Sequence, residues 1–247
     1  MVIDSRRFID RSINSSTITF DGTNTEDILS LSIVDNTSVN NNIISATGGN
    51  RSDLISLSLT AGESDSINNN NISLQGDGGF DVTSNVRDNV LNVSGGSGND
   101  TIDVNLNGGE TSDVVRNTVT IDGGQGTDLI QLDINGVLTG VDANDINIQY
   151  TDSGDLGDEI VGLDSSDTAV LDLEFSQTVF NGDADSDGNL DAGAFVLGSA
   201  AVDGDDYFIY DGSQLFYDAD GNGAGSQQLV ASFNTALPID ETNISFI

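Results

Sequence analysis

The chain has 247 residues and a formal net charge of −35, because 41 acidic residues face only six basic ones, all arginine. Such a surface repels the phosphates of nucleic acids and anionic membranes, so we expect neither nucleic acid binding nor direct membrane insertion. The absence of cysteine and histidine excludes disulfides, thiolate and imidazole metal sites, and the usual acid–base catalysis near neutral pH.

The charge needs a counter-ion if the chain is to fold. A hydrophobic content of 36% with regular alternation argues against a disordered acidic chain. Hard cations take carboxylate and carbonyl oxygens, so calcium is the expected cofactor. The first residues, MVIDSRRFID, have no apolar run of the signal-peptide type, and no segment has the length and apolarity of a membrane span.

A spacing of eleven residues recurs between a polar residue that opens an alternating run and an aspartate that follows a glycine-rich stretch. The aspartates are Asp27, Asp53, Asp81, Asp100 and Asp128, and the matching polar residues are Ser16, Asn42, Asn70, Asn89 and Asn117. A weaker copy pairs Asn144 with Asp155. A constant inner spacing with outer steps of 19 to 28 residues predicts one fixed structural unit with variable connections.

Apolar residues alternate with polar ones on both sides of each turn aspartate, which is the signature of a strand. Leu91 and Val93 precede one such turn, and Ile102 and Val104 follow it. Each unit therefore consists of a strand, a glycine turn, a strand and a polar return loop. Its apolar stripe is buried only by stacking on neighbouring units. We predict an all-β chain that forms a parallel β-solenoid (a β-roll or β-helix) of about six coils over residues 1–160.

The asparagines that open the strands have two interpretations. Stacked at one level, Asn42, Asn70, Asn89 and Asn117 would form a ladder in which each amide bonds the next. Alternatively, they reflect only the general preference of asparagine for turns. Neither interpretation gives them a catalytic role.

The third unit departs from the pattern. After Asp81, the run VTSNVRDN places Asn85 and Arg87 where the other units have leucine or isoleucine. This predicts either a kink in the solenoid or a binding surface.

Two turns carry the full pattern G-G-x-G-x-D-x-U, in which U is a large aliphatic residue. The residues are Gly95, Gly96, Gly98 and Asp100 in one turn, and Gly123, Gly124, Gly126 and Asp128 in the other. Glycine permits a positive φ that turns carbonyls inward, and the aspartate supplies a charged oxygen for calcium. The turns at Asp53, where Arg51 replaces the third glycine, and at Asp27 match less completely and are further calcium candidates. The alternative is that these glycine turns close solenoid corners without metal.

The composition changes after about residue 160. Seven of the ten phenylalanines and three of the four tyrosines lie beyond it. A solenoid needs a cap on its last coil, so we predict a β-rich, aromatic-cored capping domain over residues 161–247.

Two acidic loops in this segment match the start of an EF-hand loop, D-x-D-x-D-G. The calcium ligands expected there are Asp183, Asp185, Asp187 and Asp191 in the first loop, and Asp218, Asp220 and Asn222 in the second. Neither loop has the terminal glutamate, and the further ligand of the first loop must come from elsewhere, with Asp203, Asp205 and Asp206 as candidates. The alternative is an acidic Asx-turn without metal.

The glycine-aspartate motifs resemble the RTX (haemolysin-type calcium-binding repeat) family of secreted bacterial proteins. The stretch from FVLGSAAVDGDDYFIYDG to the final DETNISFI, within residues 170–247, is similar to the terminal module of many cyanobacterial RTX proteins. This resemblance implies type I secretion through an uncleaved C-terminal signal, and folding on calcium outside the cell. Family coils usually have two nonapeptides back to back, whereas most units here have one glycine turn, which implies metal along one edge only.

The expected function is therefore that of a secreted, calcium-binding structural protein of the cell surface or extracellular matrix: a surface-layer component, a filament subunit or an adhesin. Its expected partners are further copies of itself and the type I secretion machinery. A β-helix enzyme acting on polysaccharides is an alternative, but the chain has no lysine or histidine for acid–base chemistry, so we expect no enzyme. A second alternative is the secretion tail of a larger protein.

Overall fold

The computed structural model describes most of the chain. The described residues are 2–10, 13–21, 27–35, 39–47, 54–60, 66–68, 70–75, 77–83, 85–107, 114–135, 144–163 and 169–247. They form strands and one short 3₁₀ helix, η1 (Glu241–Asn243), with no α-helix among them. None of these described segments is a helix with the length and apolarity needed to cross a membrane.

The described strands form three sheets. In hydrogen-bonded order, sheet 1 contains β1 (Val2–Asp10), β4 (Asp27–Asp35), β7 (Leu54–Thr60), β10 (Asp77–Thr83), β13 (Thr101–Asn107), β16 (Leu129–Asn135), β18 (Asp158–Val161), β23 (Gln228–Phe233), β22 (Gln214–Tyr217), β21 (Phe208–Tyr210) and β20 (Phe195–Leu197). Sheet 2 contains β14 (Val114–Val115), β11 (Asn85–Arg87), β8 (Ser66–Asn68), β5 (Val39–Asn40) and β2 (Ile13–Asn14). Sheet 3 contains β24 (Ile244–Phe246), β19 (Ala169–Phe175), β17 (Asn144–Tyr150), β15 (Thr118–Gln125), β12 (Val90–Ser97), β9 (Asn71–Gln75), β6 (Ile43–Thr47) and β3 (Thr17–Asp21).

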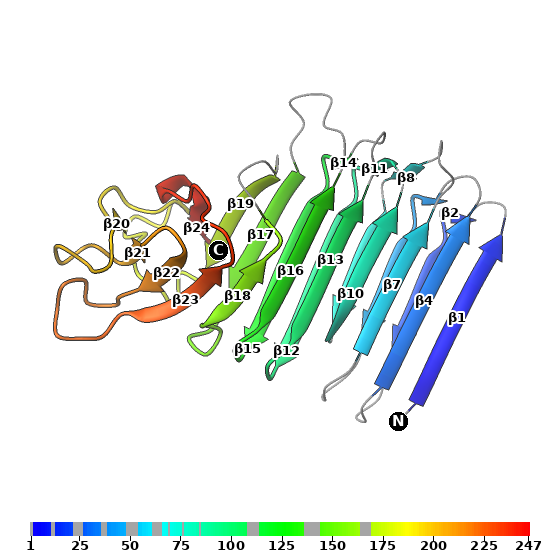
Figure 1. Cartoon of the computed structure of the whole chain (residues 1–247), viewed down its shortest axis with the longest axis horizontal. Coiled ribbons are helices and arrows are strands. Elements are labelled where there is room, and N and C mark those ends of the chain that lie inside the picture. Colours follow the sequence, from blue (N-terminus) through cyan, green and yellow to red (C-terminus); the bar gives the residue numbers. More distant parts are fainter. Residues whose placement is uncertain are drawn as a thin grey trace.

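The predicted parallel β-solenoid is confirmed. From β1 to β16, neighbouring strands within each sheet are parallel, and the chain passes from sheet 1 to sheet 2 to sheet 3 before it starts the next coil (Figure 1). The register stacks like residues, because Ile102 pairs with Ile130 and Val93 pairs with Ile121. All four side chains are buried in one continuous core. The alternation thus places every second side chain in a column of aliphatic groups.

Sheet 2 was not predicted, since the return from one coil to the next was expected to be a polar loop. The returns that contain β5, β8, β11 and β14 each have a strand of two or three residues with an apolar side chain that is fully buried. These side chains are Val39, Ile67, Val86 and Val114. The buried side chains form the third wall of the core. Asn85 and Arg87 belong to the short strand β11, which pairs in parallel with β8 and β14, so no kink is needed to explain them. The alternative of a binding surface stays a prediction.

The turn assigned to Asp81 was wrong. Asp81 lies inside β10, where its backbone pairs with that of Asn105. The residue of β10 that pairs with Ile102 is Gly78, so the register places Asp81 well after the corner that Asp100 occupies in the next coil. The spacing of 19 residues between Asn70 and Asn89 reflects this shorter unit.

The asparagine ladder is confirmed, at the corner between sheets 2 and 3. The Nδ2 groups of Asn42, Asn70, Asn89 and Asn117 each donate to the Oδ1 of the next asparagine, at 2.9–3.0 Å, and the column ends at Asn144. Each Oδ1 also accepts from the backbone N–H of the preceding ladder residue. The Nδ2 of Asn117 also donates to the carbonyl of Val86 in sheet 2. The amides therefore join neighbouring coils and also fix the return strands to the ladder.

The residue before the ladder position has a left-handed backbone. Ser15, Asn41, Asp88 and Arg116 have φ between 54° and 58°. This conformation turns the chain sharply from sheet 2 into sheet 3. Arg116 also forms a two-point ion pair with Asp88 of the previous coil, at 2.6 and 2.9 Å.

The C-terminal segment continues two of the sheets and adds an aromatic cluster. β23 pairs in parallel with β18, and β24 with β19, while β22 is antiparallel to both of its neighbours (Figure 1). Phe175 lies at the centre of the cluster, with ring centroids 4.7–6.4 Å from those of Tyr150, Phe180, Phe208 and Phe246. The number of coils, the domain division at residue 160 and the capping role of residues 161–247 stay predictions.

Candidate metal centre

The two full glycine motifs stack directly on one another at the corner between sheets 3 and 1. Gly96 pairs with Gly124, and the N–H of Gly98 donates to the carbonyl of Gln125 at 2.7 Å. Gly124 and Gly126 have φ of +85° and +147°, and a Cβ at either position would overlap the carbonyl oxygen of Gly96 or Gly98. Only glycine allows the two turns to approach this closely.

The first glycine of each motif makes room for the motif's own aspartate. A Cβ on Gly95 would lie 2.8 Å from Oδ2 of Asp100, and a Cβ on Gly123 would lie 2.5 Å from Oδ2 of Asp128. Both aspartates are consequently buried, with exposed fractions of 7% and 2%. The predicted ligand residues of the two turns are therefore brought together, with the carboxylates folded back against the glycines.

The corner aspartates form a column parallel to the asparagine ladder. Asp128 Oδ1 accepts from the backbone N–H of Asp100 at 2.7 Å, and Asp158 Oδ1 accepts from the N–H of Asp128 at 2.8 Å. In the next layer Asp158 pairs with Ala231 of β23, so the acidic column ends there. Asp128 and Asp158 thus each use one carboxylate oxygen to bind the preceding coil.

The alignment of Asp155 with the turn aspartates was wrong by three residues. β18 pairs with β16 so that Glu159 faces Leu129, which places Asp158 beside Asp128. Asp155 instead forms an isolated parallel bridge with Gly126. The corner of this coil is therefore longer than the one before it, and its extra residues bring a second carboxylate to the column.

Asp128, Asp155 and Asp158 form a buried carboxylate cluster. One oxygen from each lies within 4.8 Å of the others, and the three exposed fractions are 2%, 0% and 1%. Oδ2 of Asp155 accepts from the N–H of Thr151 at 3.2 Å. Asp155 Oδ1 and Asp158 Oδ2 are buried without a hydrogen-bond partner, as is the hydroxyl of Tyr150. Buried polar atoms are nearly always bonded, so these three oxygens fit a bound cation.

The electrostatics of the cluster favour neutral carboxyls when no cation is present. Burial, reinforced by the charges of Asp158 and Asp122, raises the pKa of Asp155 to about 8. Burial also raises the pKa of Asp158 to about 7, with Asp128 and Asp122 acting in the same direction. Burial and the three carboxylates of the cluster raise the pKa of Tyr150 well above its ordinary value. A divalent cation would remove the repulsion that causes these shifts.

In chelator, we expect the folded protein to lose stability as the pH rises from about 4 to about 8. Asp155 and Asp158 have an ordinary pKa of 3.8, which applies to the unfolded chain, and pKa values of about 8 and about 7 in the fold. Between these limits the unfolded chain releases protons that the folded chain retains, so higher pH favours unfolding. Urea melts at several pH values would measure the slope. The Asp155→Asn/Asp158→Asn variant should show a smaller slope, and an unchanged slope would contradict the assignment.

The first acidic loop also brings its predicted residues together, but at the surface. One oxygen from each of Asp183, Asp185 and Asp187 lies within 4.8 Å of the others, and Asp185 and Asp187 are exposed. The Asp187 carboxylate raises the pKa of Asp185. Asp183 accepts from the N–H groups of Asp187 and Gly188, while Asp191 Oδ2 accepts from that of Ala184. The carboxylates thus also shape the loop in the manner of Asx-turns.

The second acidic loop packs against residues 202–206. The N–H of Asn222 donates to the carbonyl of Asp203 at 2.9 Å, and Asn222 Nδ2 donates to that of Val202 at 2.8 Å. Asp206 is occupied within its own loop, since its Oδ2 accepts from the N–H groups of Val202 and Asp203. Residues 202–206, which include the suggested extra ligands of the first loop, thus pack against the second loop.

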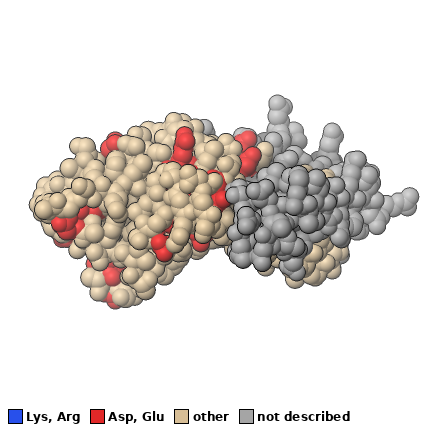
Figure 2. Space-filling view, turned by 90° about the horizontal axis from the view of Figure 1, so that it is seen from below, with Lys and Arg blue, Asp and Glu red and all other residues tan. Residues whose placement is uncertain are grey.

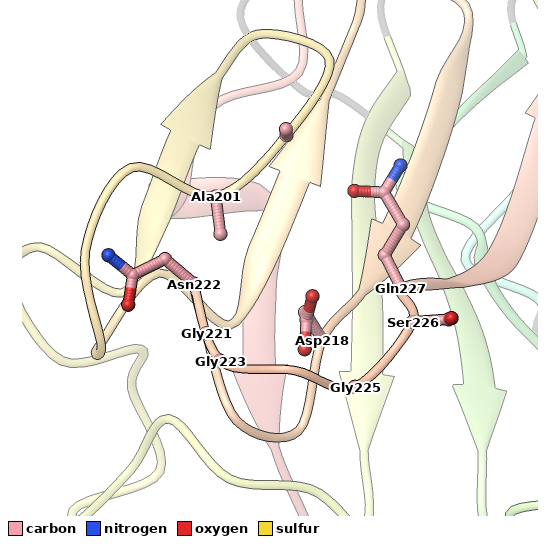
Figure 3. A pocket seen from close by; sticks show the side chains of 9 residues that line it. Ala201, Asp218, Gly221, Asn222, Gly223, Gly225, Ser226 and Gln227 are labelled. Carbon is pink, nitrogen blue, oxygen red and sulfur yellow. The ribbon is translucent and has the colours of Figure 1, made fainter.

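A pocket of about 410 Å³ opens beside this loop, where Asp218 lies between Asn222 and Gln227 (Figure 3). Its walls are otherwise small residues, among them Ala201 and several glycines. The carboxylate of Asp220 is held by the N–H of Gly225 at 3.1 Å. The predicted residues Asp218, Asp220 and Asn222 therefore lie along one loop. Within residues 169–247, only the first loop has three carboxylates with oxygens within 4.8 Å of one another.

No known protein family, curated protein or solved structure matches this chain. The candidate site is therefore assigned from its own geometry. The remaining predicted ligands do not add to it: Asp53 lies outside the described residues, and Asp27 begins β4 with a side chain that lies outside the description. On the described part of the face in Figure 2, acidic side chains are spread over the surface.

The sequence pattern missed Asp158 and Tyr150, and gave Asp155 a different position. One signal was available for Asp158, because Ile160 follows it by two residues, as Ile102 follows Asp100. Ile160 is buried in the same column of the core as Ile130. The aliphatic residue that follows, rather than the distance from the asparagine, thus identifies the corner aspartate.

Proposed function

We propose that the protein is a secreted, calcium-binding structural protein of the cell surface or extracellular matrix, which folds fully only when calcium is present. The observation that carries the proposal is the buried column of corner carboxylates, Asp100, Asp128 and Asp158, together with Asp155. Without a cation, these groups must hold protons or repel one another. Oxygen-only ligands suit a hard cation such as calcium.

Calcium would act by binding the folded state and not the unfolded chain. A ligand at 100 times its dissociation constant stabilises the folded state by about 2.7 kcal/mol per site. The net charge of −35 opposes compaction further when calcium is absent. Low calcium inside the cell would therefore keep the chain loose, and higher calcium outside would fold it. The RTX-like motifs and C-terminal stretch support secretion by type I machinery.

A structural role is supported by the shape and the ends of the solenoid. β1, β2 and β3 are the outermost strands of the three sheets on one side, and edge strands can pair with strands of another molecule. We therefore include assembly into a filament or surface layer in the proposal.

The test is far-UV circular dichroism combined with sedimentation velocity, from chelator to about 10 mM calcium, above the range of weak extracellular sites. We expect the β signal and compaction to appear cooperatively. The same concentrations of magnesium control for charge screening and should have a much smaller effect. A rise in mass with calcium would support assembly, and a constant mass would contradict that part. A chain that is fully folded in chelator at pH 8, and unchanged by calcium, would overturn the calcium-dependent function.

A further inference from the structure

The corner between β17 and β18 is the one described corner in which an inserted carboxylate lies beside the aspartate column. Its sequence is YTDSGDLGD, from Tyr150 to Asp158. The N–H of Gly126 donates to the carbonyl of Gly154 at 3.0 Å, so the longer turn still stacks on the glycine motif of the previous coil. The turn places Asp155 beside Gly126, two residues before the column aspartate Asp128.

Asp155 and Asp158 each have one carboxylate oxygen left over in this arrangement. Asp155 and Asp158 each use one carboxylate oxygen on a backbone N–H, at 3.2 and 2.8 Å. Their second oxygens have no hydrogen-bond partner, although both residues are at least 99% buried. A proton shared between the two carboxyls would require a hydrogen bond between those oxygens, and neither oxygen makes one. A proton shared between the two carboxyls therefore does not account for the two unbonded oxygens.

A single bound cation accounts for both unbonded oxygens. Ca²⁺ binds oxygens at about 2.3–2.6 Å, so two oxygens on one ion lie up to about 5 Å apart. The oxygens of Asp128, Asp155 and Asp158 lie within 4.8 Å of one another. The hydroxyl of Tyr150, which is buried and has no partner, feels the charge of all three carboxylates. Asp122 adds a fourth carboxylate close enough to act on Asp155.

We propose that Asp128, Asp155 and Asp158 bind one buried divalent cation, with Tyr150 beside it, and that this ion fastens the glycine-motif coils to the C-terminal segment. This inference deepens the proposed function and rests on it for the identity of the ion as calcium. The site is distinct from the glycine turns, because two of its three ligands lie outside both motifs.

The position of the site explains how the ion would join the glycine-motif coils to the C-terminal segment. Asp128 belongs to the second glycine turn, whereas Asp158 begins β18, which pairs with C-terminal β23. Ser232 of β23 also donates through its Oγ to the carbonyl of Asp158 at 3.2 Å. Tyr150 stacks on Phe175, the centre of the aromatic cluster, with ring centroids 5.0 Å apart. An ion here thus contacts groups that are packed against both parts of the chain.

Terbium luminescence tests the site, because Tb³⁺ replaces Ca²⁺ at oxygen sites and is excited through a nearby tyrosine. We expect the full chain to show sensitised emission that calcium displaces. The Asp155→Asn/Asp158→Asn variant keeps the shape but loses two charges, and should bind this ion about 100-fold more weakly. Tyr150→Phe should lose most of the emission of this site while native mass spectrometry still counts the ion.

The matched control is Asp183→Asn/Asp185→Asn/Asp187→Asn, which removes the same kind of cluster from the surface and should leave the Tyr150-dependent emission unchanged. The inference is overturned if Asp155→Asn/Asp158→Asn binds the same number of ions with the same affinity as the parent. If the variant binds ions unchanged and also folds on calcium, the proposed function stands and only this site is wrong. If the parent binds the ion but is already fully folded in chelator, the site stands and calcium-dependent folding falls. Circular dichroism of each variant shows that it is folded before binding is compared.

Discussion

Asn117→Ala is expected to lower the free energy of unfolding by about 3–5 kcal/mol, because it leaves several buried groups unbonded at once. The side chain is 1% exposed and makes four hydrogen bonds: two from Asn89 to its Oδ1, and two from its Nδ2 to Val86 and Asn144. Truncation removes all four and opens the ladder in its middle. Urea denaturation in saturating calcium measures the loss.

Asn92→Ala is the matched control, since Asn92 lies on the exposed face of β12 in the neighbouring coil. A surface substitution of this kind should change stability by no more than about 0.5 kcal/mol. If the two variants lose the same small amount, the ladder makes no contribution to stability, and the asparagines reflect turn preference alone.

Gly124→Ala is expected to cost about 3–5 kcal/mol, since a strained backbone and a steric overlap add together. The φ of Gly124 is +85°, and a Cβ there would overlap the carbonyl oxygen of Gly96 in the preceding coil. Gly98→Ala separates the two causes, because Gly98 has a φ of +130° but no atom within 4 Å of its Cβ position. It should cost only the backbone strain, about 1–3 kcal/mol.

Both glycine variants are compared by urea denaturation at one calcium concentration. Equal losses would mean that the turns do not stack as closely as the register of Gly96 and Gly124 requires. A greater loss for Gly98→Ala would contradict the geometry of the corner directly.

The part of the fold that follows from local patterns could be predicted from the sequence. Alternation predicts strands because neighbouring side chains point to opposite faces, and the repeat of Asn89 and Asn117 before such runs predicted the ladder. Sheet 2 could not be predicted from alternation, since its strands are only two or three residues long, too short to show an alternating pattern. A regularity was nevertheless present: Val86 and Val114 each precede the ladder asparagine by three residues.

The candidate metal centre was only half predictable for a different reason. Asp128 lies within a motif, so its neighbours in sequence identify it. Asp155 and Asp158 reach the same place through the register of β18 on β16, which depends on a turn three residues longer than the preceding one. A fixed spacing cannot anticipate such an insertion. Asp81 failed for the same reason, because the shorter third unit shifts it from the corner into β10.

The parallel stacking of coils has a mechanical consequence. Hydrogen bonds between paired strands run across the strands, and therefore along the long axis of the solenoid (Figure 1). A pull on the two ends loads the bonds of one terminal coil at a time, so the molecule unwinds in steps instead of breaking at once. A unit of 28 residues, the distance from Asn89 to Asn117, releases roughly 90 Å of extended chain. Under tension, each detached coil would lengthen the molecule while the remaining coils stayed folded.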